Sequence, residues 1–466
     1  MSGSTHNRPF LRPHEIRELV AADHRYLWHP FTQMQEWYGQ PCLIIAEGEG
    51  CYLFDVEGKR YLDGVSSLWV NLHGHRRPEI DQAVREQLDR IAHSTLLGLA
   101  HVPAIELARR LAEISPPGLT RVFYSDNGST AVEAALKIAY QYWQQQPDAT
   151  KRDRRQIVSF HNAYHGDTLG AVSVGGIELF HACYQPLLFP SLKVHYPYCY
   201  RCHLGLSNPG CGQACLEELE TLLERQAHTI AALIIEPLVQ AAAGMINAPP
   251  GYLKTVEALC RKYEVLLIAD EVAVGWGRTG TMFAVAREEV VPDLMALAKG
   301  ITGGYLPLAV TLVQESIYEA FLGDYAEGRT FFHGHTYTGN PLAARAALAS
   351  LQIFEKDRTL ENLAPKIRRL AARLEEIRRL EHVGDVRQCG FLAGIELVRD
   401  RATREPYALA ERTGMRVALE ARHHGLLIRP LGDVVVIMPP LVLSMRELES
   451  MLDVIDHCIR AVTEWR

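Results

Sequence analysis

The chain has 466 residues, of which 48% are apolar and 22% charged, and its formal net charge is −7 at pH 7. These values are typical of a globular protein with a large core, and the negative charge provides no basic surface for nucleic acid. No apolar run is long enough to span a membrane, and the first twenty residues lack the apolar core of a secretory signal, so we expect a cytoplasmic protein.

The N-terminal part is expected to contain a helix within residues 10–29, followed by an aromatic strap, LWHPFTQMQEW. Phe31 lies in this strap beside a proline, where it can pack on the body of the protein and also line a substrate pocket. From Pro41, alternating apolar and polar residues around three glycines predict a β-meander with tight turns. The meander ends in a Ser-Ser-Leu-Trp segment that contains Trp69.

A possible anion site follows a short predicted strand over residues 122–124. A Ser-Asp-Asn-Gly loop leads from this strand into a long amphipathic helix that begins at Ser129. Gly128 and Ser129 therefore lie at a helix N-terminus, where free N–H groups and the helix dipole favour a phosphate. The same residues also suit an ordinary N-cap.

Two further strand ends carry polar or aromatic residues. The strand QIVSF leads into a loop that contains Tyr164, whose ring can lie flat on a planar cofactor or simply pack the loop. The strand IAALII ends on Glu236, with Gln240 four residues further along the chain.

The ten cysteines are spread through the chain and do not indicate a disulfide framework. Four of them form a CxxC followed by a CxxxC, with His203 nearby: Cys199, Cys202, Cys211 and Cys215. This spacing suits a zinc ion, but it also suits a Gly/Pro/Asn-rich surface loop with reduced thiols. We assign no metal to the reaction site in either case.

The segment from Leu266 to Gly304 has the residues best suited to catalysis. A buried strand ends on two carboxylates, Asp270 and Glu271, and Lys299 follows the next apolar run among small and apolar neighbours. A desolvated lysine has a lowered pKa and becomes a nucleophile toward carbonyls. A lysine with a carboxylate partner is the minimum set of residues needed to bind and use pyridoxal 5′-phosphate (PLP). The alternative interpretation of these residues is a core strand that ends in a solvated Asp, with a Lys whose charged end reaches solvent.

The last third begins with a polar loop, FFHGHTYTGN, which contains Gly334 and Thr336 and precedes a helix. Charged helices and apolar strands follow, and Arg429 ends one strand, where it can clamp a carboxylate or lie on the surface. Alternating strands and helices from about residue 75 to 320 predict an α/β fold with one doubly wound, mainly parallel sheet. We expect three parts, namely 1–74 (N-terminal segment and meander, part of a small domain), 75–344 (large PLP-binding domain) and 345–466 (smaller α+β domain).

Six segments together resemble the class III, fold-type I PLP-dependent aminotransferases: SDNGSTAVEAALK, YHGDTLGA, IIEPLVQ, LLIADEVAVGWGRTG, MALAKGITGG and HTYTGNPLA. They occur in order over most of the chain. The resemblance implies that Lys299 binds PLP covalently and then shuttles a proton, while Asp270 pairs with the pyridinium nitrogen. It also implies a homodimer, because such sites are completed by the partner chain.

The resemblance assigns further roles at the matching positions. Gly128 and Ser129 would bind the phosphate, with Thr336 reaching across from the second subunit. Tyr164 and Val272 would lie on the two faces of the ring, and Tyr164 is also implied as catalytic. Gln240 would lie near the ring hydroxyl, and Glu236 would organise the same wall of the site. The residues implied around the substrate are Phe31, Trp69, Tyr164 and Gly334, with Arg429 on its carboxylate.

Segments outside the shared core resemble the branch that aminates 8-amino-7-oxononanoate (KAPA) to 7,8-diaminononanoate in biotin synthesis: WHPFTQM, DGVSSLWVNLHGH, HSTLLG and IRPLGDVVVIMPP. Members that use S-adenosylmethionine typically have Tyr, Trp and Tyr where this chain has Phe31, Leu68 and Val436. Because cations favour aromatic faces, these departures remove contacts that the sulfonium of S-adenosylmethionine could use. The resulting pattern is similar to that of the branch that uses L-lysine, and the donor stays open between the two. The alternatives are an ω-amino acid or diamine aminotransferase that uses pyruvate or 2-oxoglutarate, and an internal aminomutase.

Overall fold

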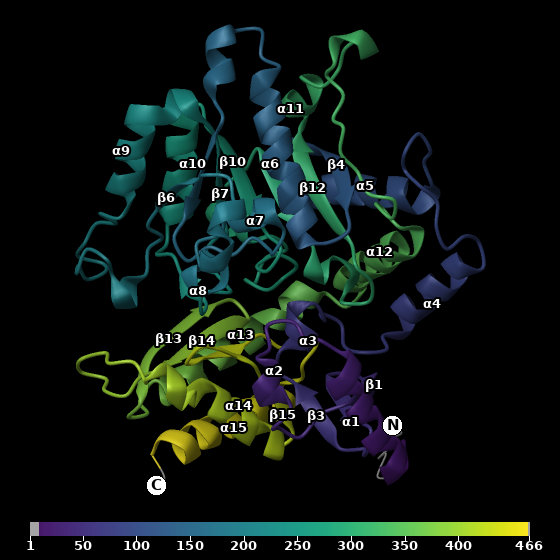
Figure 1. Cartoon of the computed structure of the whole chain (residues 1–466), viewed down its shortest axis with the longest axis vertical. Coiled ribbons are helices and arrows are strands. Elements are labelled where there is room, and N and C mark those ends of the chain that lie inside the picture. Colours follow the sequence, from purple (N-terminus) through teal and green to yellow (C-terminus); the bar gives the residue numbers. More distant parts are fainter. Residues whose placement is uncertain (1–8, 465–466) are drawn as a thin grey trace.

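The computed structural model describes residues 9–464, and a seven-stranded sheet forms its centre (Figure 1). The strand order is β4-β12-β11-β10-β7-β5-β6. The strands are β4 (Leu119–Ser125), β5 (Gln156–Phe160), β6 (Leu192–Val194), β7 (Ile230–Ile235), β10 (Leu266–Asp270), β11 (Leu294–Leu297) and β12 (Ala309–Gln314). Only β12 pairs antiparallel with its neighbours, so the predicted mainly parallel sheet is confirmed.

Both faces of this sheet are covered, because its central strands are apolar at every position. Along β7, Leu233 and Ile235 enter one hydrophobic core, whereas Ala232 and Ile234 enter the other. This is the alternation expected of a strand buried on both sides. The helices around the sheet are α4 (Pro78–Leu88), α5 (Val102–Ile114), α6 (Gly128–Gln144), α7 (Leu169–Val174), α9 (Leu216–Gln226), α10 (Tyr252–Lys262), α11 (Glu315–Glu319) and α12 (Pro341–Lys356).

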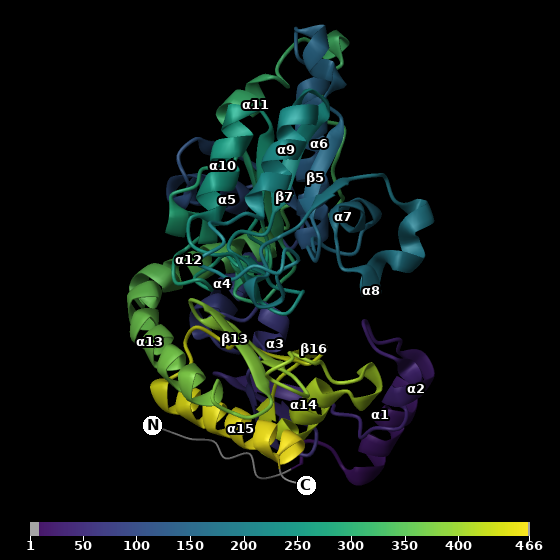
Figure 2. The same cartoon turned by 90° about the vertical axis from the view of Figure 1, so that its left-hand side faces the viewer.

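The N-terminal and C-terminal parts of the chain lie together below the large sheet (Figures 1 and 2). The predicted meander is formed by β1 (Ile45–Glu49), β2 (Tyr52–Asp55) and β3 (Arg60–Asp63), and β15 (Leu426–Leu427) joins it parallel to β3. A second antiparallel sheet contains β13 (Val383–Cys389), β14 (Leu392–Leu397), β16 (Pro430–Leu431) and β17 (Val434–Ile437). Its helices are α13 (Thr359–Ile377), α14 (Thr413–His423) and α15 (Met445–Thr463).

The remaining elements are short or terminal: α1 (Pro13–Tyr26), α2 (Met34–Trp37), α3 (Ser66–Trp69), α8 (Glu178–His181), β8 (Val239–Gln240) and β9 (Ile246–Asn247). The boundary expected at residue 345 falls inside α12, a continuous helix that packs against α4 and α5. We therefore propose that the large domain extends to the end of α12. None of the helices within residues 9–464 has the length and apolarity needed to cross a membrane.

Candidate active site

The loops that follow five strands of the large sheet, namely β4, β5, β7, β10 and β11, meet at one edge, and they enclose a cavity of about 690 Å³. Such an edge is where α/β sheets bind ligands. The cavity therefore brings together most of the side chains that the sequence marked as a site: Trp69, Gly128, Ser129, Tyr164, Glu236, Asp270, Val272 and Lys299.

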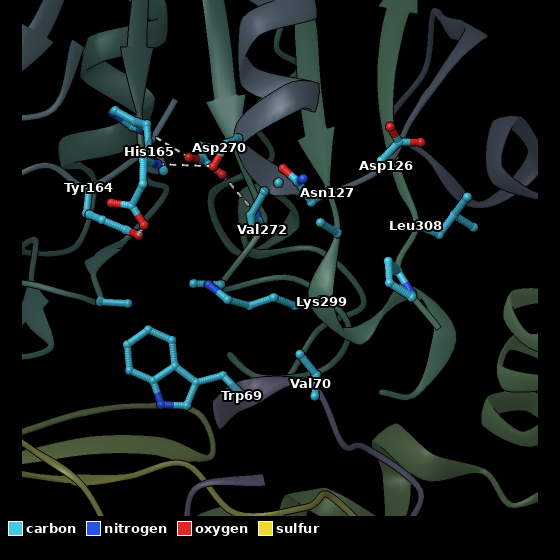
Figure 3. A pocket seen from close by; sticks show the side chains of 18 of the residues that line it. Trp69, Val70, Asp126, Asn127, Tyr164, His165, Asp270, Val272, Lys299 and Leu308 are labelled. Atoms are coloured by element: carbon cyan, nitrogen blue, oxygen red, sulfur yellow. Dashed lines mark hydrogen bonds and ion pairs between the residues drawn. The ribbon is translucent and has the colours of Figure 1, made fainter. Parts of the chain in front are cut away.

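Lys299 lies at the centre of this cavity, directly after β11 (Figure 3). Its backbone has a φ of 46°, a left-handed conformation that is strained for a residue with a side chain. The Nζ atom lies 5.0 Å from the centroid of the Trp69 ring. Burial lowers the pKa of the Lys299 amine, although the nearby carboxylates of Asp270 and Glu236 oppose the shift. The amine is therefore more easily deprotonated than that of an exposed lysine.

Asp270, at the end of β10, is held by two hydrogen bonds (Figure 3). Its Oδ2 lies 2.7 Å from Nδ1 of His165, and its Oδ1 accepts a bond of 3.0 Å from the backbone N–H of Val272. Asp270 and His165 are each 3% exposed, so the carboxylate has little freedom to turn. No role was predicted for His165 from the sequence, although its position beside Tyr164 was a signal that could have found it.

Glu236 fastens the loop after β5 to the end of β7. Its two carboxylate oxygens accept bonds of 3.0 Å each from the backbone N–H groups of Tyr164 and Ala241. Burial raises the pKa of Glu236 to about 7. The Tyr164 hydroxyl donates a bond of 2.6 Å to Asp167, and burial together with this carboxylate raises the pKa of the phenol. Tyr164 is thus positioned through both its backbone and its side chain.

The N-terminus of α6 forms an anion cradle at one side of the cavity. Asn127 caps the helix by accepting the N–H of Thr130, at 3.1 Å, which leaves the N–H groups of Gly128 and Ser129 outside the cap. A Cβ atom on Gly128 would lie 2.7 Å from Cγ1 of Val272, so only glycine lets these two segments approach so closely. The free N–H groups and the dipole of this 17-residue helix suit a phosphate.

A second cavity, of about 470 Å³, adjoins the first and shares Trp69, Tyr164 and Lys299 with it. Among the other residues that line it are Phe31, Leu68, Phe180 and Arg429. Apolar and aromatic side chains thus line the cavity that leads to Lys299. Arg429 is exposed there and can bind a carboxylate.

Several residues that the sequence marked lie outside both cavities. Gln240 is 1% exposed, and its Nε2 donates to the backbone carbonyl of His161 at 2.9 Å. Gly334 and Thr336 are exposed on the loop before α12. Val436 is buried within β17, so in this chain it lines neither cavity.

The residues of the first cavity fit PLP. The α6 cradle matches its phosphate, Asp270 offers a fixed acidic partner for the ring nitrogen, and Lys299 offers a desolvated amine for the aldehyde. The close contact of Gly128 with Val272 keeps the space beside the cradle narrow, as a flat ring requires.

Comparisons with known proteins agree with this chemistry. The family description "Aminotransferase class-III" matches residues 33–459. The "Adenosylmethionine-8-amino-7-oxononanoate aminotransferase" of Geobacter sulfurreducens is 57% identical over 97% of this chain and 99% of its own length. The crystal structure of the protein of that name from Methanocaldococcus jannaschii is 45% identical, with a TM-score of 0.91 over 96% of this chain and 99% of that chain.

A different aminotransferase is also similar in structure. An (S)-enantioselective omega-transaminase from Thermomicrobium roseum superposes with a TM-score of 0.91 over 96% of this chain and 99% of that chain, at 36% identity. With a family match over most of its length and relatives above half identity, the chain belongs to the class III aminotransferases, which are PLP-dependent enzymes.

Proposed function

We propose that this aminotransferase transfers an amino group to KAPA and so forms 7,8-diaminononanoate, a step of biotin synthesis. The observation that supports it most is the 57% identity to a relative named for that acceptor, over nearly the full length of both chains. The structure supports the same proposal, because two adjoining cavities share Lys299, one of which suits PLP and the other a substrate.

PLP, when bound, supplies an electron sink that allows an amino group to pass from a donor to an acceptor. In our proposal, Lys299 holds it covalently and later accepts and returns a proton at Nζ. Asp270, fixed by His165, pairs with the ring nitrogen, and the N–H groups of Gly128 and Ser129 bind the phosphate. Tyr164 and Val272 would pack on the two faces of the PLP ring.

The second cavity suits an acceptor with an apolar chain that ends in a carboxylate, as KAPA has. Phe31, Leu68 and Phe180 offer apolar surface, and the ring centroids of Phe31 and Phe180 are 5.3 Å apart. Arg429, which lies in the same wall, would bind the carboxylate as a bidentate donor. Burial of the apolar chain and one charged contact together provide affinity and orientation.

The amino donor is either S-adenosylmethionine or L-lysine, and different observations favour each. The name of the relatives includes adenosylmethionine. Phe31 and Leu68, however, provide neither a phenol hydroxyl nor an indole face in the second cavity, which leaves fewer contacts for a sulfonium. Val436 is buried in β17 and lines neither cavity of the single chain, so it adds no argument for either donor.

We also propose that the enzyme is a homodimer. Gly334 and Thr336 are exposed and line neither cavity of their own chain, which supports their reaching the site of a second subunit. Most oligomers of this kind have twofold symmetry, so each subunit would complete the other.

A pair of half-reactions tests the proposed acceptor and identifies the donor. The purified PLP enzyme is mixed with L-lysine or S-adenosylmethionine alone, the loss of cofactor absorbance is recorded, and KAPA is then added. We expect the absorbance to return after KAPA with one of the two donors, and Lys299→Ala to abolish both changes. If neither donor allows KAPA to restore the absorbance while pyruvate or 2-oxoglutarate does, the omega-transaminase assignment replaces this one.

A further inference from the structure

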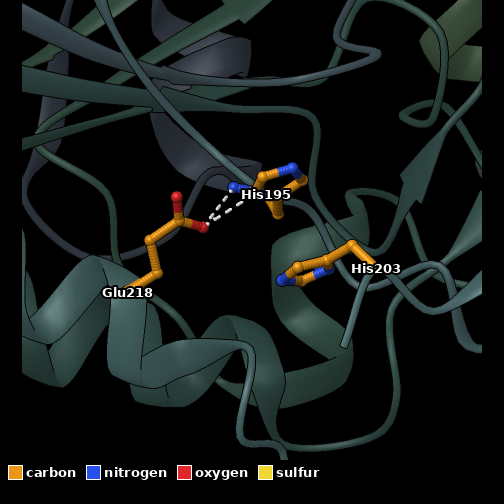
Figure 4. A group of neighbouring side chains, drawn as sticks. All are labelled: His195, His203 and Glu218. Carbon is orange, nitrogen blue, oxygen red and sulfur yellow. Dashed lines mark hydrogen bonds and ion pairs between the residues drawn. The ribbon is translucent and has the colours of Figure 1, made fainter. Parts of the chain in front are cut away.

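A second cluster of chemically active side chains lies at the edge strand of the large sheet, away from both cavities. His195 follows the end of β6, His203 lies in the cysteine-containing loop, and Glu218 lies in the first turn of α9 (Figure 4). None of the three lines the cavities around Lys299. Three separate segments thus contribute one side chain each to the same place.

The geometry of this cluster brings three potential metal-binding atoms together. One ligand atom from each residue lies within 4.8 Å of the others. The two imidazole rings are stacked, with centroids 4.1 Å apart and planes inclined by 12°. Glu218 Oε2 lies 3.0 Å from Nδ1 of His195 and also accepts the backbone N–H of His195 at 2.8 Å. A metal ion lies about 2 Å from each ligand atom and in the plane of each imidazole ring. The ring of His203 must therefore turn out of the stack before both imidazoles can bind the same ion.

The two imidazoles are held differently. Glu218 accepts a hydrogen bond from the backbone N–H of His195 and contacts its ring, whereas His203 is exposed on the cysteine-containing loop. Within residues 9–464, His203 has no side-chain hydrogen bond that a bound ion would have to displace.

The four cysteines of the loop are close to this cluster but do not form the site. All four line a small cavity next to it, together with His203: Cys199, Cys202, Cys211 and Cys215. In the described part of the chain, however, the group of convergent ligand atoms contains no thiol.

We propose that His195, His203 and Glu218 bind a divalent transition-metal ion of the zinc class, with water in the fourth position. Two imidazoles and one carboxylate form a donor set that zinc accepts, and a water molecule then completes the tetrahedron.

The ion would have a structural role, because it would connect the cysteine-containing loop to β6 and α9. The same loop also reaches the second sheet, where Tyr198 and Arg201 bind Glu396 of β14, the latter at 2.7 Å. Fixing the loop at the zinc site would therefore stabilise the contact between the large sheet and the C-terminal sheet, without contributing to the chemistry at Lys299.

The test uses the PLP-loaded enzyme, dialysed with Zn²⁺ and then freed of unbound metal, with zinc measured by inductively coupled plasma mass spectrometry. We expect one Zn²⁺ per chain in the wild type and a rise in the unfolding temperature on Zn²⁺ addition. His203→Gln and Glu218→Gln should lose both the zinc and the rise, whereas the matched controls Glu217→Gln and His228→Gln, on exposed neighbouring positions, should keep both. Turnover of the PLP enzyme should stay within about twofold in all four variants.

A variant with all four cysteines of the loop changed to serine distinguishes the two possible ligand sets. We expect this variant to keep its zinc, and the Co²⁺-substituted wild type to show no thiolate-to-metal charge-transfer absorption. Loss of zinc in the serine variant, or retention of zinc in His203→Gln, would assign the ion to the thiols and overturn the proposal. A wild-type enzyme without bound zinc after dialysis would overturn it as well.

Discussion

At the scale of single residues, Lys299 shows how its surroundings prepare a side chain for chemistry. Burial disfavours its ammonium form, while Asp270 and Glu236 keep the pKa from falling further. Trp69 lies on one side of the amine, with Nζ 5.0 Å from the ring centroid. The left-handed backbone of Lys299 adds strain that only a well-packed surrounding maintains. The amine is therefore desolvated and held in place before any substrate binds.

The lowered pKa of Lys299 predicts a pH dependence. When the enzyme carries the amino form of the cofactor, Lys299 is free and acts as a base only when neutral. The saturated rate with KAPA should thus fall as the pH falls through its pKa, with a midpoint below the ordinary value of 10.5. Stopped-flow absorbance measures this rate. Lys299→Arg, which stays protonated, should be roughly 10²- to 10⁴-fold slower and show no such limb. A wild-type midpoint at or above 10.5 would contradict the assignment.

At the scale of elements, two local conformations shape the site. The first is α3, where four successive residues without glycine have positive φ, from 41° at Ser67 to 75° at Trp69. Asp63, fully buried, accepts bonds of 2.8 Å from the N–H and the hydroxyl of Ser67, which helps to offset the cost of this turn. The second is the start of α6, where Gly128 lies against Val272. Both elements set the width of the space around Lys299.

The contact between Gly128 and Val272 predicts that Gly128→Ala weakens PLP binding, and Val272→Ala serves as the control. Gly128→Ala places a Cβ 2.7 Å from Cγ1 of Val272, so Val272 or the start of α6 must shift, and both line the cavity proposed for PLP. We expect an overpacking cost of about 1–3 kcal/mol, which corresponds to roughly 5- to 150-fold weaker PLP binding. Fluorescence titration of the apoenzyme measures the affinity. Because Val272→Ala removes the clashing methyl groups, the double variant should bind PLP better than Gly128→Ala alone. An unchanged or additive loss would show that the clash is not the cause.

The sequence predicts those elements that depend on residues close together in the chain. Apolar runs predicted the buried strands β7 and β10, and the polar residues at their ends predicted the cavity edge, because strand ends in a parallel sheet meet. The sequence could not show that β15 pairs with β3 or that Val436 is buried, because both depend on contacts between distant segments. The domain boundary at 345 fell inside α12 because the change in composition precedes the end of that helix.

At the scale of the whole molecule, the two ends of the chain together form the wall opposite the large sheet. Phe31 and Trp69 come from the N-terminal part, Arg429 from the C-terminal part, and Lys299 from the large sheet. The second cavity therefore exists only when all three parts are assembled. The loop with Gly334 and Thr336 does not take part in this wall and remains exposed in the single chain.

The exposed loop predicts complementation between two inactive chains. In the proposed homodimer, Thr336→Arg would block the phosphate cradle of the partner subunit, while Lys299→Ala removes the amine of its own site. In a mixed dimer, one site then has an intact Lys299 and receives the unchanged Thr336 from the other chain. Because the subunits of a symmetric dimer mix at random, co-expression should restore about a quarter of the wild-type activity. This value applies to the unfractionated mixture, whereas mixed dimers purified through different tags on the two chains should have about half of the wild-type activity.

The pattern of recovery distinguishes a shared site from a self-contained one. If Thr336 acted within its own chain, the site with an intact Lys299 would also have the blocking arginine, and no mixture could be active. A chain with both substitutions, paired with Lys299→Ala, has no intact lysine and should stay inactive in either case. Since Thr336 is exposed, the arginine can be accommodated by the folded single chain. Loss of activity in Thr336→Arg together with recovery in the mixed dimer would therefore reflect the partner's site rather than misfolding.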